Sequence, residues 1–326
     1  MRPDTPAKLN VHSPSAIRIW PLSPRTPIAR RHLLQGERAR IRKGFELMPI
    51  SFHAADNGFT HVCAHRGYSL HYPENTLLAF EAAKAAGATT CEIDLVLTRD
   101  GEAVVIHDAL LDRTTDGHGF VADCDLAGIR ERDAATRFEG RFSGVRVPTF
   151  AETVLWAKQA GMGLVVEMKE RERPDALSSR VLSVLNETDG VGQVQILSFN
   201  HVDLARIKEK APELRTEAIV HARHVDIVAV LKSCGASSVS FELDMFAAED
   251  AEAVHAAGIS NRVHIPGPNV LAPYWMHGRD PRAQIGAWLS AGLIDSLSGD
   301  DVPFLRKLVD QNPIRLPLTR SPRIVA

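Results

Sequence analysis

The sequence predicts an α/β protein folded as a closed (β/α)8 TIM barrel. Short apolar runs alternate with stretches of helical periodicity from residue 61 to residue 309. Such an alternation is typical of a parallel sheet covered by helices, and this many repeats favour closure into a barrel over an open sheet. The chain of 326 residues has room for such a barrel, which commonly takes about 200–250 residues.

The first repeat shows the signals that define the others. The apolar run His61–His65 reads as a strand. Thr76–Ala86 has apolar residues at helical spacing, and Gly87 is placed to end it. Either Asn75 or Thr76 can cap the start of this helix. Further strands are expected at Thr90–Leu97, Leu164–Lys169, Val194–Ser198, Thr216–Val220, Ser237–Phe241, Arg262–Ile265 and Leu293–Leu297, and helices at Thr149–Ala160, His201–Lys210, His224–Ser233, Ala247–Ala257, Pro281–Ala291 and Val302–Val309.

One step departs from the strand–helix alternation. The segment Leu97–Glu102 is too short for a helix, and its Asp-Gly pair is a hairpin signal. The run Ala103–Ile106 is therefore expected to return antiparallel to the preceding strand. A turn centred on the Asp-Gly pair brings His107 roughly opposite Asp94. With this run the strands exceed eight by one, so a hairpin arm or the last run should lie outside the barrel.

Three segments stand apart from the repeats. Residues 1–58 are expected to form a disordered N-terminal extension, because their prolines break any helix. This extension is basic, since residues 1–47 hold ten Lys/Arg and three Asp/Glu. Residues 59–316 would form the barrel domain, and residues 317–326 a C-terminal tail. Residues 109–147 lack clear periodicity, and a segment of this length is often functional rather than a simple connector.

The composition describes an ordinary globular protein, with 44% hydrophobic and 24% charged residues. No apolar run approaches the roughly 18 residues of a membrane span, so no transmembrane segment is expected. The four cysteines form no Cys-x-x-Cys pattern, which favours a reducing compartment and a cytoplasmic location. The basic extension contains no recognisable nucleic-acid-binding module. Two alternatives to a disordered extension stay open: a transit peptide, or a true start of translation at Met48. The oligomeric state stays open.

Carboxylates alternate along one of the predicted strands. Glu92 and Asp94 lie two residues apart, so they share a face, and such a pair costs free energy unless a cation or proton neutralises it. Glu167 and Lys169 form a second pair with the same spacing. Since barrel active sites form at the C-terminal ends of the strands, the three carboxylates are expected to meet there. They describe a site for a hard cation, Mg²⁺ or Ca²⁺, with Mn²⁺ also possible.

Two histidines follow apolar runs beside these carboxylates. His65 ends the first predicted strand, and His107 comes directly after the hairpin arm. Histidine is the side chain best matched to proton transfer near neutral pH. Two histidines that flank a cation site indicate metal-assisted acid/base chemistry.

These residues belong to a series of short motifs that resembles the glycerophosphodiester phosphodiesterase family over roughly residues 60–200. Any one of the motifs is a weak signal, but together their order and spacing are specific. The motifs are His65-Arg66-Gly67, Pro73-Glu74-Asn75-Thr76, Glu92-Ile93-Asp94, His107-Asp108, Arg113-Thr114-Thr115 with Gly117 and Gly119, and Glu167-Met168-Lys169.

The resemblance implies metal-dependent hydrolysis of a small glycerophosphodiester to an alcohol and sn-glycerol 3-phosphate. It also implies that residues 109–147 are an insertion over the barrel mouth. It leaves open which histidine is the acid, and whether water attacks directly or a cyclic phosphate forms first. Carried over position by position, the catalytic pair is His65 and His107, the metal ligands are Glu92, Asp94 and Glu167, and the phosphate contacts are Arg66 and Lys169.

The later part of the chain departs from the family pattern. Val263–Asn269 lacks the usual tryptophan, and Trp275 follows only after an insertion. Ser298-Gly299-Asp300 with Pro303 only loosely echoes the usual ending, so we expect an unusual alcohol pocket. A lysophospholipase D-type or non-glycerol phosphodiesterase on the same barrel is the first alternative. A non-catalytic phosphodiester-binding barrel is the second, although retention of both histidines and all three carboxylates argues against it.

Overall fold

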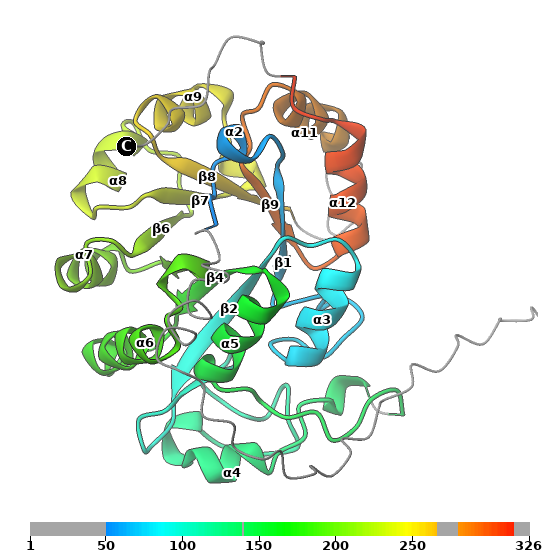
Figure 1. Ribbon diagram of the computed structural model, residues 1–326, viewed down its shortest axis with the longest axis vertical. Coiled ribbons are helices and arrows are strands. Elements are labelled where there is room, and N and C mark those ends of the chain that lie inside the picture. The colour runs from blue at the N-terminus through cyan, green and yellow to red at the C-terminus, as the bar shows by residue number, and fades with distance from the viewer. Residues whose placement is uncertain (1–49, 139, 266–279, 316–326) are drawn as a thin grey trace, which may run out of the picture. The chain divides into compact units, whose positions relative to one another are not determined.

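Eight parallel strands close into a barrel in the described part of the computed structural model, residues 50–138, 140–265 and 280–315. Strand β1 pairs with both β2 and β9, and this pairing closes the ring (Figure 1). The predicted (β/α)8 TIM barrel is confirmed. The barrel strands are β1 (His61–His65), β2 (Thr90–Leu97), β4 (Gly163–Met168), β5 (Val194–Ser198), β6 (Arg215–Val220), β7 (Ser238–Glu242), β8 (Ser260–His264) and β9 (Ser296–Gly299).

The remaining strand, β3 (Ala103–Val105), pairs antiparallel with β2 outside the ring, so it is the hairpin arm that exceeded the count of eight. The expected register is wrong by one residue. We expected His107 opposite Asp94, but the N–H of Ile106 donates to the Asp94 carbonyl at 3.0 Å. The reason is the turn, because the loop Arg99–Gly101 has three residues and ends in a glycine with a φ of 83°.

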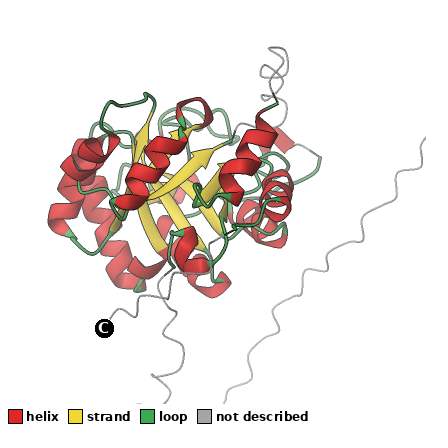
Figure 2. Ribbon diagram, turned by 90° about the horizontal axis from the view of Figure 1, so that it is seen from above, coloured by secondary structure: helices red, strands yellow, loops and turns green. Residues whose placement is uncertain are grey.

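Helices return the chain between the strands and cover the outside of the barrel (Figure 2). Helix α5 shows the expected signals: Thr149 and Glu152 form a capping box, and Gly161 ends the helix with a φ of 67°. Helix α6 was not predicted, although a proline in its first turn and apolar residues at helical spacing indicate a helix. The helices are α2 (Ala54–Asn57), α3 (Leu77–Ala85), α4 (Leu126–Arg130), α5 (Phe150–Ala160), α6 (Pro174–Thr188), α7 (His201–Lys210), α8 (Ile227–Ser233), α9 (Ala248–Ala256), α11 (Pro281–Ser290) and α12 (Val302–Gln311).

The barrel interior has a polar middle layer. Arg262 of β8 donates to Glu217 of β6 at 2.7 Å and to the Ser298 hydroxyl of β9 at 2.9 Å. All three side chains are buried. The outward-facing apolar residues of the strands pack instead against the helices in the main core. A buried ion pair that is fully hydrogen-bonded in this way ties three strands of the ring together.

Residues 50–57 belong to the barrel unit, whereas we expected the N-terminal extension to run to residue 58. Phe52 is buried against Ile50 and apolar residues of the barrel interior. Ile50 and Phe52 also lie beside Gly163, the first residue of β4. Arg215 is the first residue of β6, and its guanidinium lies over the Phe52 ring, 4.9 Å from the ring centre. Gly163 and Arg215 are the first residues of their strands, so this segment forms the floor of the barrel, opposite the site.

The segment 109–147 packs on the hairpin. It contains α4 and the 3-10 turns Val121–Asp123 and Thr136–Phe138. Its buried residues Val121 and Ile129 share a small core with apolar residues of β2 and β3. This separate core holds the insertion beside the C-terminal ends of the strands.

Several predictions lie outside the described residues: the disorder of residues 1–49, the start at Met48, the tail 317–326, and the segment around Trp275. The four cysteines carry free thiols, and those of Cys63 and Cys91 are buried. None of the helices found in the described ranges combines the length and apolar character that crossing a bilayer requires.

Candidate active site

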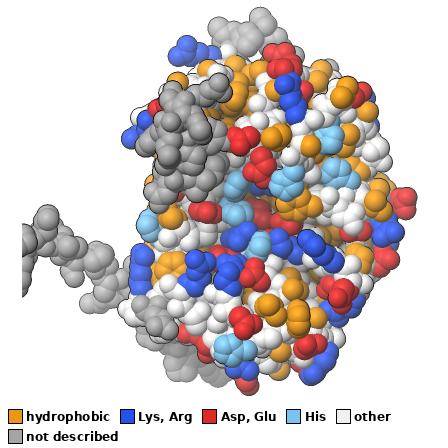
Figure 3. Space-filling model, turned by 180° about the vertical axis from the view of Figure 1, so that it is seen from behind, with side chains coloured by type: hydrophobic (Ala, Val, Ile, Leu, Met, Phe, Trp, Pro, Cys, Tyr) orange, Lys and Arg blue, Asp and Glu red, His pale blue; other side chains and the backbone are white. Residues whose placement is uncertain are grey.

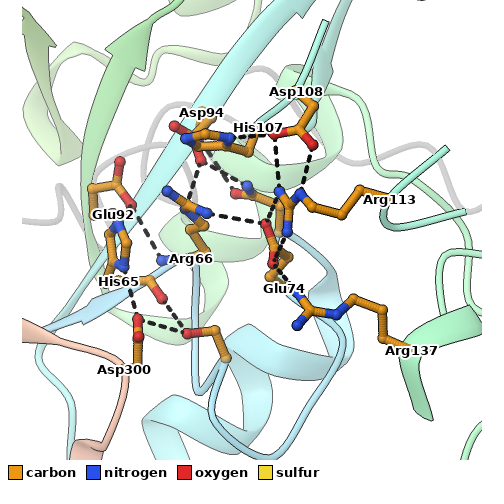
Figure 4. Close-up of polar contacts among 12 residues, drawn as sticks. His65, Arg66, Glu74, Glu92, Asp94, His107, Asp108, Arg113, Arg137 and Asp300 are labelled. Carbon is orange, nitrogen blue, oxygen red and sulfur yellow. Dashed lines mark hydrogen bonds and ion pairs between the residues drawn. The ribbon is translucent and has the colours of Figure 1, made fainter. Parts of the chain in front are cut away.

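The residues predicted to form the site meet where the strands end. His65 is the last residue of β1, Glu92 and Asp94 lie on β2, and Glu167 lies on β4, with Lys169 just beyond it. On the face shown in Figure 3, acidic, basic and histidine side chains gather near the middle. Figure 4 shows the polar contacts that join them.

Glu92, Asp94 and Glu167 form a buried carboxylate cluster. One oxygen of each lies within 4.8 Å of the others. Burial, followed by repulsion from Asp94, raises the pKa of Glu92 to about 7. Asp94 is fully buried, and within the described residues its Oδ1 atom has no hydrogen-bond partner. Crowded carboxylates with an oxygen that accepts no hydrogen bond fit a hard divalent cation, which would relieve the repulsion and coordinate that oxygen.

The turn after β1 places two side chains against Asp94. Arg66 and Asn75 both have left-handed backbone, with φ of 58° and 57°, a conformation that costs free energy outside glycine. Asn75 Nδ2 donates to Asp94 Oδ2 at 2.8 Å, and Arg66 Nε lies 3.3 Å from the same oxygen. We expected Asn75 only as a possible helix cap, but Thr76 caps α3. Asn75 therefore orients a carboxylate of the cluster.

Lys169 joins the carboxylates to the second histidine. Its Nζ atom lies 3.0 Å from His107 Nε2 and 3.1 Å from Glu167 Oε1. It also lies 3.5 Å from Asp94 Oδ1. One ammonium therefore contacts a predicted acid/base group and two predicted metal ligands.

His65 is oriented by residues from the other end of the sequence. Its Nδ1 atom lies 2.7 Å from Asp300 Oδ1, and the Ser69 hydroxyl donates to the same oxygen at 3.0 Å. Burial opposes protonation of His65, but the Asp300 hydrogen bond and the nearby Glu92 carboxylate together raise its pKa. The ring of His264 packs edge-on at 4.9 Å, and burial and His65 lower the pKa of His264 to about 3. His264 is thus a neutral neighbour.

His107 is held by a chain of ion pairs that crosses to the insertion. Its Nδ1 atom lies 2.6 Å from Asp108 Oδ1, and Arg113 Nε donates to the other Asp108 oxygen. The Arg113 hydrogen bond is the main cause that lowers the pKa of Asp108 to about 2. Arg113 also donates to both oxygens of Glu74 at 2.7 Å, and Arg66 donates to Glu74 at 3.2 Å. Glu74 therefore connects the two histidine environments.

All seven residues predicted from the sequence lie in this constellation, while their roles stay predictions. Sequence reasoning missed Glu74, Asp300 and His264. Glu74 lies inside a motif that had been noted without a role for this residue. Asp300 lies in a segment noted only as a loose echo of the family's usual ending, and His264 was given no role. Their contacts with His65 had no signal in the sequence, because only closure of the barrel brings β8 and β9 beside β1.

Comparison with known proteins decides the family. The profile of the glycerophosphoryl diester phosphodiesterase family matches residues 65–264, which include every residue of the predicted site. The chain belongs to this family.

The relatives support the same placement. A glycerophosphodiester phosphodiesterase of Caldanaerobacter subterraneus subsp. tengcongensis is 39% identical over 157 residues, 48% of this chain and 65% of the relative. One of Bacillus subtilis is 32% identical over 177 residues, 50% of this chain and 60% of the relative. The matches thus span less than two thirds of the length of these two relatives. A phosphodiesterase of Oleispira antarctica, solved in complex with the product sn-glycerol-3-phosphate, has a TM-score of 0.65 at 25% identity, covering 78% of this chain and 98% of that chain.

Proposed function

We propose that this protein is a metal-dependent glycerophosphodiester phosphodiesterase, which releases an alcohol and sn-glycerol 3-phosphate. The observation that carries the proposal is the meeting of three buried carboxylates, two imidazoles and two cationic side chains at one barrel mouth. Family membership supports the reaction class. The sn-glycerol-3-phosphate bound by the Oleispira antarctica phosphodiesterase supports a product of the same chemistry.

The carboxylate cluster Glu92, Asp94 and Glu167 would hold the divalent cation, Mg²⁺ or Ca²⁺, with Mn²⁺ also possible. A cation there would neutralise the negative charge that grows on the phosphate oxygens during attack on phosphorus. Arg66 and Lys169 supply fixed positive charge beside the cluster. Such preorganised charge commonly provides a large part of the rate enhancement.

Hydrogen bonding supports an assignment of the two histidines. An ammonium can only donate, so Nε2 of His107 accepts from Lys169, and the neutral ring carries its proton on Nδ1 beside Asp108. A neutral imidazole can take the proton of the nucleophile, either water or a hydroxyl of the glycerol, which makes His107 the general base. His65 is then the general acid that protonates the leaving alkoxide. Whether the histidine takes up or gives away a proton, its carboxylate partner orients the ring and stabilises the protonated form.

The alternatives require features that the site does not favour. A lysophospholipid would need an apolar approach for its acyl chain, whereas Arg66, Arg113 and Arg137 line the cavity beside His65. A non-catalytic binding barrel has no use for two imidazoles that each contact a carboxylate through Nδ1. The cytoplasmic location stays a prediction, and the oligomeric state stays open.

An enzyme-coupled assay of glycerol 3-phosphate release from a panel of glycerophosphodiesters tests the proposal. We expect release with Mg²⁺ or Ca²⁺, loss with a chelator, and loss in His107→Ala. His118→Ala is the matched control, because the His118 side chain is 87% exposed on the insertion. Folded protein that releases no glycerol 3-phosphate from any diester would refute the proposal.

A further inference from the structure

We propose that the cavity beside His65 receives the released alcohol and favours an alcohol that carries an anionic group, with Arg137 setting this preference. The inference rests on the proposed function and deepens it. The cavity has a volume of about 460 Å³, within the range of small-molecule sites. One wall is the turn after β1 and the other is the insertion. The lining residues that matter here are His65, Arg66, Glu74, Arg113, Arg137 and Phe138.

Two cavities border the site, one beside His65 and one beside Glu167 and Lys169. The second has about 200 Å³ and is lined by Glu167, Lys169 and polar groups that include Ser198 and Asn200. A phosphodiester has two arms on one phosphorus, so each cavity can take one arm. The smaller cavity also contains the carboxylates of Glu170 and Asp203, and these together with the Ser198 hydroxyl offer acceptors for the two hydroxyls of glycerol. The larger one is lined by His65, the general acid, so the alkoxide that it protonates leaves on that side.

The three arginines that line the larger cavity differ in how firmly carboxylates hold them. Among its lining residues, three arginines face the carboxylates of Glu74 and Asp300. Arg66 is held by Asp94, and Arg113 by Asp108 and Glu74. Asp300 is engaged by His65. The remaining guanidinium, that of Arg137, is the one in this lining that no carboxylate holds by a hydrogen bond.

Arg137 is available to a ligand. Its Nη1 atom lies 3.6 Å from Glu74 Oε2, an oxygen to which Arg113 already donates at 2.7 Å. Within the described residues the Arg137 guanidinium donates no hydrogen bond, and its side chain is 59% exposed. Figure 4 shows Arg137 extending from the insertion toward Glu74. A planar guanidinium with free donors matches a carboxylate or phosphate group on the alcohol.

A cationic alcohol such as choline fits the cavity less well. Quaternary ammonium groups bind on open aromatic faces. Phe138 lines the cavity directly beside Arg137 in the sequence. Its neighbours Tyr72 and Phe142, which stack at 5.3 Å, lie outside the lining, and the Arg141 guanidinium lies over both rings, at 5.8 and 5.2 Å. These faces are already used by a cation of the chain itself. Within the cavity itself, the Arg137 guanidinium beside Phe138 disfavours a second cation.

Three diesters of sn-glycerol 3-phosphate that differ only in the alcohol test the proposal: 3-hydroxypropionate, propanol and choline esters. They have similar lengths and carry an anionic, a neutral and a cationic end. We expect kcat/KM to fall in that order. Arg137→Gln should reduce the ratio of the 3-hydroxypropionate to the propanol ester about tenfold, as for a partly exposed charge-assisted pair. Arg137→Glu should reverse the preference between the anionic and the cationic ester.

Arg306→Gln, which removes an arginine from the outer helix α12, is the matched control and should leave the ratios unchanged. Diester hydrolysis with a choline preference in the wild type, or with ratios that Arg137→Glu does not alter, would overturn this proposal alone. Failure to hydrolyse all three esters, and any other glycerophosphodiester, would overturn the proposed function and this inference with it. Because Arg137 is exposed and makes only a 3.6 Å contact, both variants are expected to fold.

Discussion

The Nδ1 atom of His65 lies 2.7 Å from Oδ1 of Asp300, a residue 235 positions later in the chain. His107 has the same relation to Asp108, its direct neighbour in sequence. Both imidazoles are thus fixed through Nδ1 by a carboxylate, so Nε2 is the ring atom for proton transfer, and in His107 this atom accepts a hydrogen bond from Lys169. The first of these partners lies in the part of the chain that departs from the family pattern.

Asp300 is expected to act as a positioning residue for His65. Its pKa of about 2 keeps it ionised in any ordinary assay. Asp300→Asn keeps the shape and an acceptor oxygen but removes the charge, so we expect kcat to fall about 10- to 100-fold with little change in KM. Asp301→Asn is the control, because asparagine replaces aspartate well as the N-cap of α12. Equal losses in the two variants would count against a specific link to His65.

Lys169→Met should reduce kcat about 100- to 1,000-fold, the usual cost of removing one donor that stabilises charge in the transition state. The substitution also removes the donor to His107 Nε2. Steady-state kinetics with the best diester measures the effect. Lys158→Met, on the outside of the barrel, removes an equal charge and should keep full activity. Wild-type kcat in Lys169→Met would contradict the assigned role.

Metal binding should raise the thermal stability of the chelator-treated protein. At a concentration 100 times the Kd, a ligand adds about 2.7 kcal/mol to the free energy of unfolding. Asp94→Asn should abolish the shift in Tm that Mg²⁺ or Ca²⁺ produces. Glu242→Gln, which removes a carboxylate from the end of β7 outside the cluster, should keep it. A metal-induced shift that survives in Asp94→Asn would place the cation elsewhere.

Gly67→Ala should destabilise the fold more than Gly101→Ala. Both glycines have positive φ, 81° and 83°, so each substitution costs about 1 kcal/mol of backbone strain. A Cβ on Gly67 would also lie 2.7 Å from Ala79 Cβ, whereas one on Gly101 meets nothing within 4 Å. We expect Gly67→Ala to cost about 2 kcal/mol more, as for overpacking. Urea denaturation compares the two, and equal losses would show that α3 moves away freely.

The sequence predicted the features that depend on neighbours along the chain. Strand–helix alternation gave the barrel, and the spacing of Glu92 with Asp94 and of Glu167 with Lys169 gave most of the cluster. The hairpin register was missed by one residue, because the number of residues in a glycine turn does not follow from an Asp-Gly pair. Helix α6 was overlooked despite its apolar spacing.

Features that depend on ring closure could not be predicted in this way. The contact of His65 with Asp300 and His264 exists only because the last two strands return to the first. Asn75 shows a different limit. Its sequence context is that of a helix cap, and only the left-handed turn at Arg66 and Asn75 directs the amide toward Asp94.

The floor formed by Ile50 and Phe52 fixes how much of the chain an expressed domain needs. A chain shortened to begin at residue 59 would keep every residue of the site, yet it would expose the apolar lower end of the barrel, where Phe52 packs near Gly163 and Arg215. We expect such a protein to aggregate and therefore to show no activity in an assay, even though it keeps every residue of the site. Residue 50 is therefore the latest sensible starting point, and an affinity tag placed before it would leave the molecule from the side away from the substrate.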